Sequence, residues 1–241
     1  MSTKTSTSPA SNDDVSQKNE VSKNEVEFPK SVFGIRTIFR IMMHLFSRYT
    51  VVGRENRPDY QFLMTTNHLA FMDVPAMAGG LNRDVAVFAA KKYLGTRLEW
   101  MFRLGSPVWI EQEAPDRQAL MFMMKLAKQG HNSGVAPEGH RSKTGGLLQG
   151  QEGAAFLATR ANLPILPIVA WGTERIFKHP RPKVMVKIGK PYRLPEGRAK
   201  GDQLKEYTDR IMCALAALLP ESYHGVYAGH PLIEEMAELV R

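Results

Sequence analysis

The most informative stretch of the chain reads FLMTTNHLAFMD and runs from Phe62 to Asp73. Residues 62–66 have the apolar and β-branched character of a short buried strand, and Pro75, just beyond the stretch, favours the first turn of a helix. Polar side chains between a strand end and a helix start are typical of sites in α/β proteins. The stretch therefore predicts a strand, a polar loop that holds a candidate site, and a helix.

His68 and Asp73 are the reactive side chains of this loop. A continuous helix would set them roughly 140° apart, so they can pair only if the loop folds back. A paired carboxylate would fix the imidazole tautomer and leave the second ring nitrogen to take a proton from a hydroxyl. The alternative is that Asp73 only caps the helix and His68 is a turn residue.

Short β-rich runs alternate with helical stretches around this loop. We expect strands at 62–66, 85–89, 107–111, 134–136, 165–171 and 183–188, and helices at 74–80, 91–103, 115–129, 151–161, 202–219 and 231–240. Alternation of this kind predicts an α/β fold in which helices cover a sheet. We find no internal repeat and no clear linker to a second domain.

The N-terminal region divides into two parts. Residues 1–28 lack the apolar periodicity that would offset the entropy of ordering, so we expect a disordered tail. Residues 29–50 are mostly apolar and predict an amphipathic helix, whose charges at Arg36 and Arg40 argue against a membrane span. The helix could lie at a membrane interface or pack on the protein's own core, and both readings stay open.

The overall composition narrows the class of partner. The formal net charge of +8 favours an anionic partner, while the basic residues follow no nucleic-acid-binding motif. Cys213 is the single cysteine, and no histidines or carboxylates show metal spacing, so we expect a reducing compartment and no metal. The first thirty residues contain no secretory run. We therefore expect the cytoplasmic side and, where the helix at 29–50 lies at a membrane interface, a peripheral or monotopic protein at the cytoplasmic face of that membrane.

A second polar cluster, EGHRS, spans residues 138–142 after the short β run 134–136. Arg141 can clamp a phosphate through parallel donors, and Gly139 lets the backbone approach an anion. The alternative is a basic surface turn in which Glu138 pairs with Arg141. No G-x-S-x-G elbow occurs, which argues against a serine hydrolase.

The segments NHLAFMD at 67–73, PEGHRS at 137–142 and LPILPI at 163–168 occur in that order and resemble successive blocks of the glycerophospholipid acyltransferase family. Residues 50–220 or so are similar to 1-acylglycerol-3-phosphate acyltransferases. The resemblance implies an acyltransferase domain over residues 51–241, with a central mixed sheet flanked by helices. It implies His68 as catalytic base and Asp73 as its orienter.

The same resemblance implies the reaction partners. The donor would be acyl-coenzyme A or acyl-carrier protein, the acceptor a lysophospholipid such as 1-acylglycerol-3-phosphate, and no further cofactor is expected. The predicted substrate-binding residues are Asn67, Glu138, Gly139, Arg141 and Ser142.

One departure from the family pattern concerns the acceptor. Gln112 stands where the family commonly has an arginine that binds glycerol phosphate, and Arg117 is a candidate to replace it at the acceptor phosphate. A lost charged hydrogen bond of about 1.5 to 3 kcal/mol would weaken phosphate binding. Two alternatives therefore stay open: acylation of another lipid alcohol, such as a glycolipid or amino lipid, and an inactive lipid-binding protein.

Overall fold

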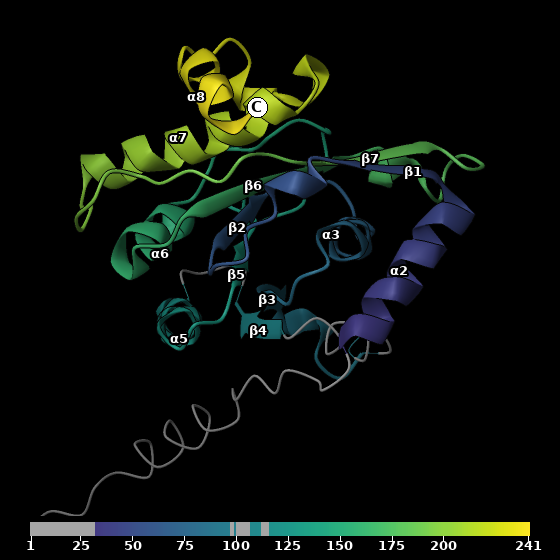
Figure 1. Ribbon diagram of the computed structural model, residues 1–241, viewed down its shortest axis with the longest axis horizontal. Coiled ribbons are helices and arrows are strands. Elements are labelled where there is room, and N and C mark those ends of the chain that lie inside the picture. The colour runs from purple at the N-terminus through teal and green to yellow at the C-terminus, as the bar shows by residue number, and fades with distance from the viewer. Residues whose placement is uncertain (1–31, 97–98, 100–106, 112–115) are drawn as a thin grey trace, which may run out of the picture.

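The computed structural model describes residues 32–96, 99, 107–111 and 116–241. Its central sheet has the strand order β1-β7-β6-β2-β5-β3-β4 (Figure 1). Neighbouring strands are parallel except for β6 and β7, which are antiparallel. The strands are β1 (Arg48–Val52), β2 (Leu63–Thr66), β3 (Ala86–Ala90), β4 (Pro107–Ile110), β5 (Ser133–Val135), β6 (Ile165–Trp171) and β7 (Lys183–Ile188).

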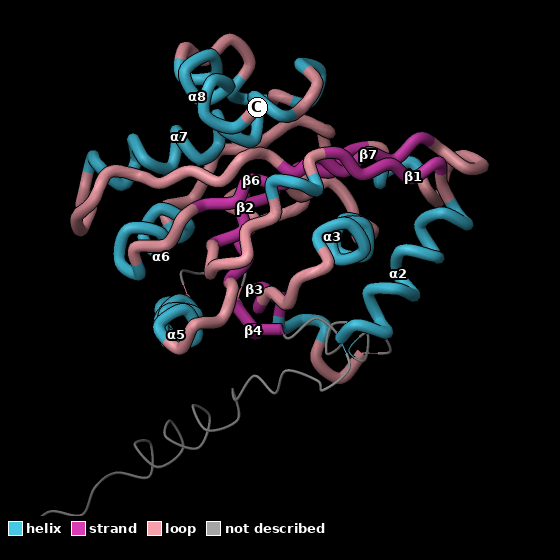
Figure 2. Tube along the Cα trace, viewed as in Figure 1, coloured by secondary structure: helices cyan, strands magenta, loops and turns pink. Residues whose placement is uncertain are grey.

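Helices cover both faces of the sheet, as Figure 2 shows around the magenta strands. On one face lie α5 (Arg117–Lys128), α6 (Gly153–Ala161) and α7 (Asp202–Leu218), and α8 (Leu232–Val240) packs on α7. On the other face lie α2 (Val32–Phe46) and α3 (Asp73–Leu81). A separate apolar core fills each interface. The prediction of an α/β fold with a central mixed sheet flanked by helices is confirmed.

The centre of the sheet positions the site. All four residues of β2 are buried, and β2 lies parallel to both β5 and β6. Because the carboxyl ends of parallel strands meet at one edge, the chain segments that follow β2, β5 and β6 leave the sheet side by side. The loop after β2 carries His68, and the loop after β5 carries Glu138 and Arg141.

The first helix is shorter than predicted. It ends at Phe46, where the Ser47 hydroxyl bonds the Met43 carbonyl oxygen at 2.6 Å, and residues 48–50 of the expected helix belong to β1. Strand β1 forms because Arg48–Val52 pairs in parallel with β7, a partner more than a hundred residues away. Residues 29–31 lie outside the described residues.

Helix α2 packs closely on α3. A Cβ at Gly79 would lie 3.1 Å from the Arg40 backbone nitrogen, so the absence of a side chain allows this approach. Phe39 lines a cavity beneath the helix, and Met43 is fully buried. One side of α2 therefore packs on the protein's own core, which is one of the two arrangements that the sequence left open.

Some other predicted elements differ from the structure at their ends. The helix expected at 91–103 begins with a single 3₁₀ turn, η2 (Lys91–Tyr93), because Leu94 is extended and Gly95 is left-handed with φ of 72°. The remaining predicted strands and helices that the structure describes match within one or two residues. The tail at 1–28 and Pro115 lie outside the described residues.

Candidate active site

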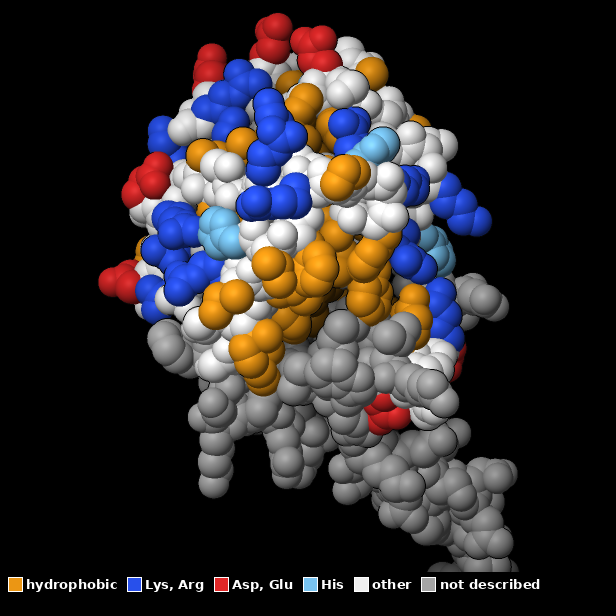
Figure 3. All heavy atoms as spheres, turned by 90° about the vertical axis from the view of Figure 1, so that its right-hand side faces the viewer, with side chains coloured by type: hydrophobic (Ala, Val, Ile, Leu, Met, Phe, Trp, Pro, Cys, Tyr) orange, Lys and Arg blue, Asp and Glu red, His pale blue; other side chains and the backbone are white. Residues whose placement is uncertain are grey.

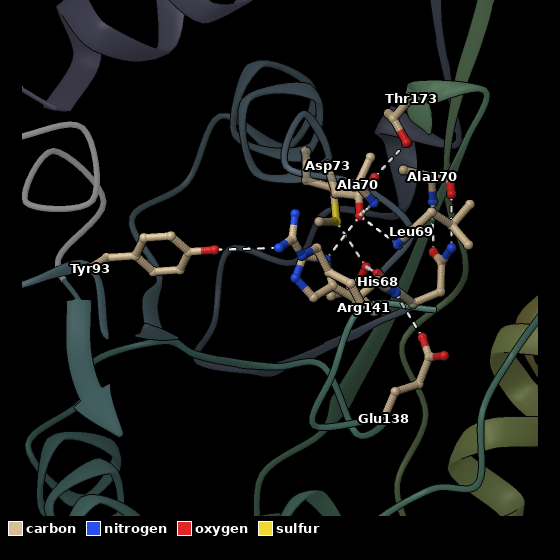
Figure 4. Close-up of polar contacts among 12 residues, drawn as sticks. His68, Leu69, Ala70, Asp73, Tyr93, Glu138, Arg141, Ala170 and Thr173 are labelled. Atoms are coloured by element: carbon tan, nitrogen blue, oxygen red, sulfur yellow. Dashed lines mark hydrogen bonds and ion pairs between the residues drawn. The ribbon is translucent and has the colours of Figure 1, made fainter. Parts of the chain in front are cut away.

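His68 and Asp73 lie against each other at the start of α3 (Figure 4). The loop folds back so that Nδ1 of His68 lies 2.9 Å from Oδ2 of Asp73. The same oxygen accepts hydrogen bonds from the backbone N–H groups of Leu69 and Ala70, each at 2.7 Å. The predicted pairing of the two side chains is present, while their catalytic roles stay predictions.

Asp73 does not act as the N-cap of α3. Met72 holds that position without a side-chain hydrogen bond, and Asp73 is the first helical residue. Its carboxylate binds N–H groups of the turn that precedes the helix. The reading of Asp73 as only a helix cap is therefore wrong, because its carboxylate oxygens accept hydrogen bonds from His68, from the loop and from Thr173.

The backbone of His68 is held by the second polar cluster. Its N–H donates to Oε1 of Glu138 at 2.7 Å, and its carbonyl oxygen accepts from the N–H of Ser142 at 2.8 Å. The other carboxylate oxygen of Glu138 accepts from the N–H of Leu148 at 2.8 Å. Burial raises the pKa of Glu138 to about 7, against the opposing effect of these two N–H donors.

Asn67 ties the loop to β6. Its amide nitrogen donates to the Ala170 carbonyl oxygen at 2.8 Å, and its amide oxygen accepts from the Ala170 N–H at 2.9 Å. Ser142 is also buried, and its hydroxyl donates to the Gly146 carbonyl oxygen. Direct substrate contact by Asn67, Glu138 and Ser142 stays a prediction, and the observed bonds show them holding His68 and its loop in place.

A cavity of about 1140 Å³ opens beside His68. His68, Gly139, Arg141 and Arg117 line it, so four of the predicted site residues meet there, whereas Asp73 lies behind the imidazole. Apolar residues of α2, α3 and β3 form much of its wall. Further basic residues that line it are Arg36, Arg83, Lys92, His140 and Lys143.

Sequence reasoning missed two kinds of contributor. Lys143 lines the cavity although it belongs to no predicted site motif. Lys92 also lines it: its position just after a strand suits the phosphates of an acidic donor, but the sequence favoured a solvated helix end equally, so it was not among the predicted site residues. Thr173, which follows β6, donates to Oδ1 of Asp73 at 2.5 Å. No local pattern links Thr173 to a residue one hundred positions earlier.

Neither the metal prediction nor the Gln112 departure receives a direct structural test. Within the residues that the structure describes, no three His, Cys, Asp or Glu side chains gather as the ligands of a metal ion would. Gln112 lies outside those residues.

The family comparison extends over this site. The family model described as Acyltransferase matches residues 48–171, just over half of the chain, which includes His68, Asp73 and the loop at 138–142. The chain belongs to the acyltransferase family. This match, together with the relatives and the solved structure described next, confirms the resemblance to the glycerophospholipid acyltransferases.

Curated relatives and a solved structure narrow the comparison. The chloroplastic 1-acyl-sn-glycerol-3-phosphate acyltransferase BAT2 of Brassica napus is 26% identical over 57% of this chain and 41% of the relative. The 1-acyl-sn-glycerol-3-phosphate acyltransferase of Saccharomyces cerevisiae is 27% identical over 71% of this chain and 59% of the relative. The chain thus spans between two fifths and three fifths of these relatives' lengths.

The crystal structure of PlsC, the 1-acyl-sn-glycerophosphate acyltransferase of Thermotoga maritima, superposes with a TM-score of 0.61 at 25% identity. The match covers 81% of this chain and 85% of that one. The two proteins therefore share the mixed sheet and its flanking helices.

Proposed function

We propose that this chain transfers a fatty acyl group from an acyl thioester to the hydroxyl of a lysophospholipid such as 1-acylglycerol-3-phosphate. The observation that carries the proposal is the His68–Asp73 pair, whose imidazole lines a cavity with apolar walls and more basic than acidic side chains. The family match and the names of the relatives support the same reaction. The donor would be acyl-coenzyme A or acyl-carrier protein.

The reaction begins with a proton transfer to His68. Asp73 engages Nδ1, so Nε2 is the nitrogen left to accept the proton of the acceptor hydroxyl. The hydroxyl oxygen attacks the thioester carbonyl, an ester C–O bond forms, and the C–S bond breaks. The proton on Nε2 then passes to the leaving thiolate. Asp73 stabilises the imidazolium that forms in between. The reaction needs no co-substrate other than the thioester.

The cations of the cavity suit an anionic lipid. Arg141 and Arg117 carry guanidinium groups that can bind a phosphate through paired donors, and the Arg141 guanidinium lies 3.4 Å from the Tyr93 hydroxyl. Gly139 has a left-handed backbone with φ of 70° and lines the same wall. A side chain there would be strained, and its Cβ would lie 3.3 Å from the amide nitrogen of Gln151.

The size and apolar walls of the cavity suit an acyl chain. Ordinary small-molecule pockets enclose about 300 to 1000 Å³, so a cavity of about 1140 Å³ has room for a reacting headgroup together with a fatty chain. Burying such a chain contributes about 0.8 kcal/mol for each CH₂ group. The apolar side chains that line the cavity include Ile35, Phe39, Phe71, Val74, Met77, Leu81, Val85, Val87 and Phe88.

We also propose that the outer side of α2 contacts the membrane that supplies the acceptor. Four of its large apolar side chains are between 53% and 65% exposed: Ile38, Ile41, Leu45 and Phe46. The Arg48 guanidinium donates to the Arg181 carbonyl oxygen, and the Arg181 guanidinium donates to the His44 carbonyl oxygen near the end of α2. Figure 3 shows the hydrophobic side chains of this side in a central band bordered by Lys and Arg. Such a surface fits an anionic bilayer interface.

No helix within the described residues is long and apolar enough to cross a membrane. We propose a peripheral or monotopic contact, and we place it on the cytoplasmic face because of the single cysteine.

Acylation of another lipid alcohol is the second candidate. It is favoured by Gln112, which replaces an arginine expected at the acceptor phosphate. Arg117 lines the cavity from the first position of α5 and is the cation that would compensate for that arginine. The choice between the two acceptors depends on whether Arg117 binds the phosphate.

The test incubates the purified protein with labelled acyl-coenzyme A, or with labelled acyl-carrier protein, and a total polar-lipid extract. Labelled products are identified by mass spectrometry for the native chain, for His68→Ala and for His179→Ala, an exposed histidine outside the cavity. We expect labelled phosphatidic acid from the native chain and from His179→Ala. The His68→Ala variant should be slower by roughly 10² to 10⁴, because it lacks the general base.

The possible outcomes separate the candidates. A labelled glycolipid or amino lipid in place of phosphatidic acid would select the second acceptor class. Labelled product formed equally by His68→Ala would refute the role of His68. No labelled lipid with either donor would indicate a lipid-binding protein without transferase activity.

A further inference from the structure

The two carboxylate oxygens of Asp73 have unequal sets of partners. Oδ2 accepts three hydrogen bonds, from Nδ1 of His68 and from the N–H groups of Leu69 and Ala70. Oδ1 accepts one hydrogen bond, from the hydroxyl of Thr173 at 2.5 Å. Asp73 is 0% exposed and Thr173 is 1% exposed, so water does not replace either partner.

The fold fixes Thr173 at this place. Gly172 turns the chain out of β6 with φ of 83°, and a Cβ there would lie 2.1 Å from the Lys183 carbonyl oxygen. Thr173 then opens the short 3₁₀ helix η3 (Thr173–Arg175). The double hydrogen bond between Asn67 and Ala170 ties the end of β6 to the loop that carries His68. The Thr173 hydroxyl is thus held by β6 and not by α3.

A carboxylate turns easily about its last torsion, because sp³–sp² torsions have broad minima. Because the carboxylate is planar, the three donors on Oδ2 also restrict the direction of Oδ1, but all three come from the loop 68–70 and hold the carboxylate only relative to that loop. The Thr173 hydroxyl supplies a second, independent anchor on Oδ1. It also keeps a buried carboxylate oxygen from being left unsatisfied, which is costly in a protein interior.

We propose that Thr173 is a positioning residue of the His68–Asp73 pair, because its hydroxyl fixes the plane of the Asp73 carboxylate and thereby keeps the His68 proton on Nδ1. The proposal rests on the proposed function for its catalytic consequence, although the state of the imidazole is independent of it. Thr173 does not line the cavity, so it acts through Asp73 and does not contact substrate.

The test compares the native chain with Thr173→Val and Thr173→Ser. Valine keeps the shape and lacks the hydroxyl, and serine restores the hydroxyl. Thr208→Val is the matched control, since Thr208 is 2% exposed and its hydroxyl bonds the Leu204 carbonyl oxygen within α7. The ring nitrogens of His68 are observed by ¹⁵N NMR and assigned with His68→Ala, and kcat and KM are measured on the same samples.

We expect one tautomer, with the proton on Nδ1, in the native chain, Thr173→Ser and Thr208→Val. Thr173→Val should show a mixture of tautomers. Its kcat should fall by about tenfold to a hundredfold with little change in KM, less than the roughly 10² to 10⁴ expected from removing the base. If Thr173→Val does not fold, Thr173→Ala also removes the hydroxyl and places no methyl group against the Asp73 carboxylate.

An unchanged tautomer and an unchanged kcat in Thr173→Val would overturn the proposal, even if thermal stability fell. Such a result would mean that the hydroxyl contributes to stability alone. Failure of the proposed function is recognised separately. A native chain without transfer activity would still show whether the tautomer of His68 depends on the Thr173 hydroxyl.

Discussion

Asp73 is the residue on which the polar contacts of the site converge. A fully buried carboxylate is costly unless it is paired, and here four donors surround it, one on Oδ1 and three on Oδ2. Three of those donors come from the loop that Asp73 itself closes. The negative charge of Asp73 is therefore directed at the imidazole of His68 by the fold of its own loop.

Glu138 gives a pH-dependent prediction at the residue scale. Its pKa is raised from the ordinary 4.5 to about 7 by burial, so between these values the folded state binds more protons than the unfolded state. The favourable contribution of the protonated side chain is complete below about pH 4.5 and is lost as the pH rises to about 7. We expect the free energy of unfolding to fall in this window by at most about 1.4 kcal/mol for each pH unit.

The Glu138→Gln variant isolates this contribution. Glutamine does not titrate and can accept from only one of the two N–H groups that Glu138 binds, so a constant loss is added at every pH. The free energy of unfolding of the variant minus that of the native chain should therefore increase from about pH 4.5 to 7 and then level off. Denaturant unfolding at a series of pH values measures this difference, and a difference independent of pH would contradict the account.

The sequence predicted the His68–Asp73 pair because both residues lie in one loop, where spacing and the early Pro75 restrict the geometry. It did not predict the bonds of that loop to Ala170 and Thr173, because these form only when β2 and β6 pair. It also did not predict the bond between Glu138 and the His68 N–H, which depends on the pairing of β2 with β5. Spacing along the sequence therefore predicts contacts within one loop, whereas contacts between loops depend on which strands pair.

At the scale of the elements, α2 and β1 show where sequence patterns are ambiguous. The run from residue 31 to 52 is mostly apolar on both sides of Ser47, so its pattern does not mark the change from helix to strand there. Strands such as β6 and β7 were predicted with correct bounds because Pro and Gly surround them. The strand order of the sheet is a long-range property that no local pattern in this chain records.

The two sides of α2 lead to a prediction about membranes. Ile41 on the outer side is 62% exposed, and burying such a side chain in lipid contributes about 1.5 to 3 kcal/mol. Ile41→Glu should therefore weaken co-sedimentation with anionic liposomes by about tenfold or more. Thermal stability should be unchanged, because residue 41 lies outside the core and its substitution does not disturb core packing.

Val226→Glu is the matched control for this experiment. Val226 is also 62% exposed, but it lies in η5 (Gly225–Tyr227), between α7 and α8. Its substitution introduces the same charge away from α2 and should leave liposome binding near the native value. Equal binding by Ile41→Glu and the native chain would show that the outer side of α2 does not contact lipid.

At the scale of the whole molecule, the mixed sheet brings two sequence blocks into one site. The blocks at 67–73 and 137–142 follow β2 and β5, and the block at 163–168 leads into β6, the strand on the other side of β2. The net charge of +8 and the basic residues at the cavity favour anionic lipids as partners. The proposed membrane side, α2, is also a wall of the cavity, so an acceptor could pass from bilayer to site along one helix.

The most direct test of the central claim is the rate of acyl transfer by Asp73→Asn. The amide oxygen can take the place of Oδ2 while its nitrogen donates to the Thr173 hydroxyl, so the hydrogen bonds persist and only the charge is removed. We predict a rate roughly 10² to 10⁴ below that of the native chain, with Asp209→Asn, a carboxylate beside Tyr227, near the native rate. An Asp73→Asn variant that transfers acyl groups at the native rate would contradict the account.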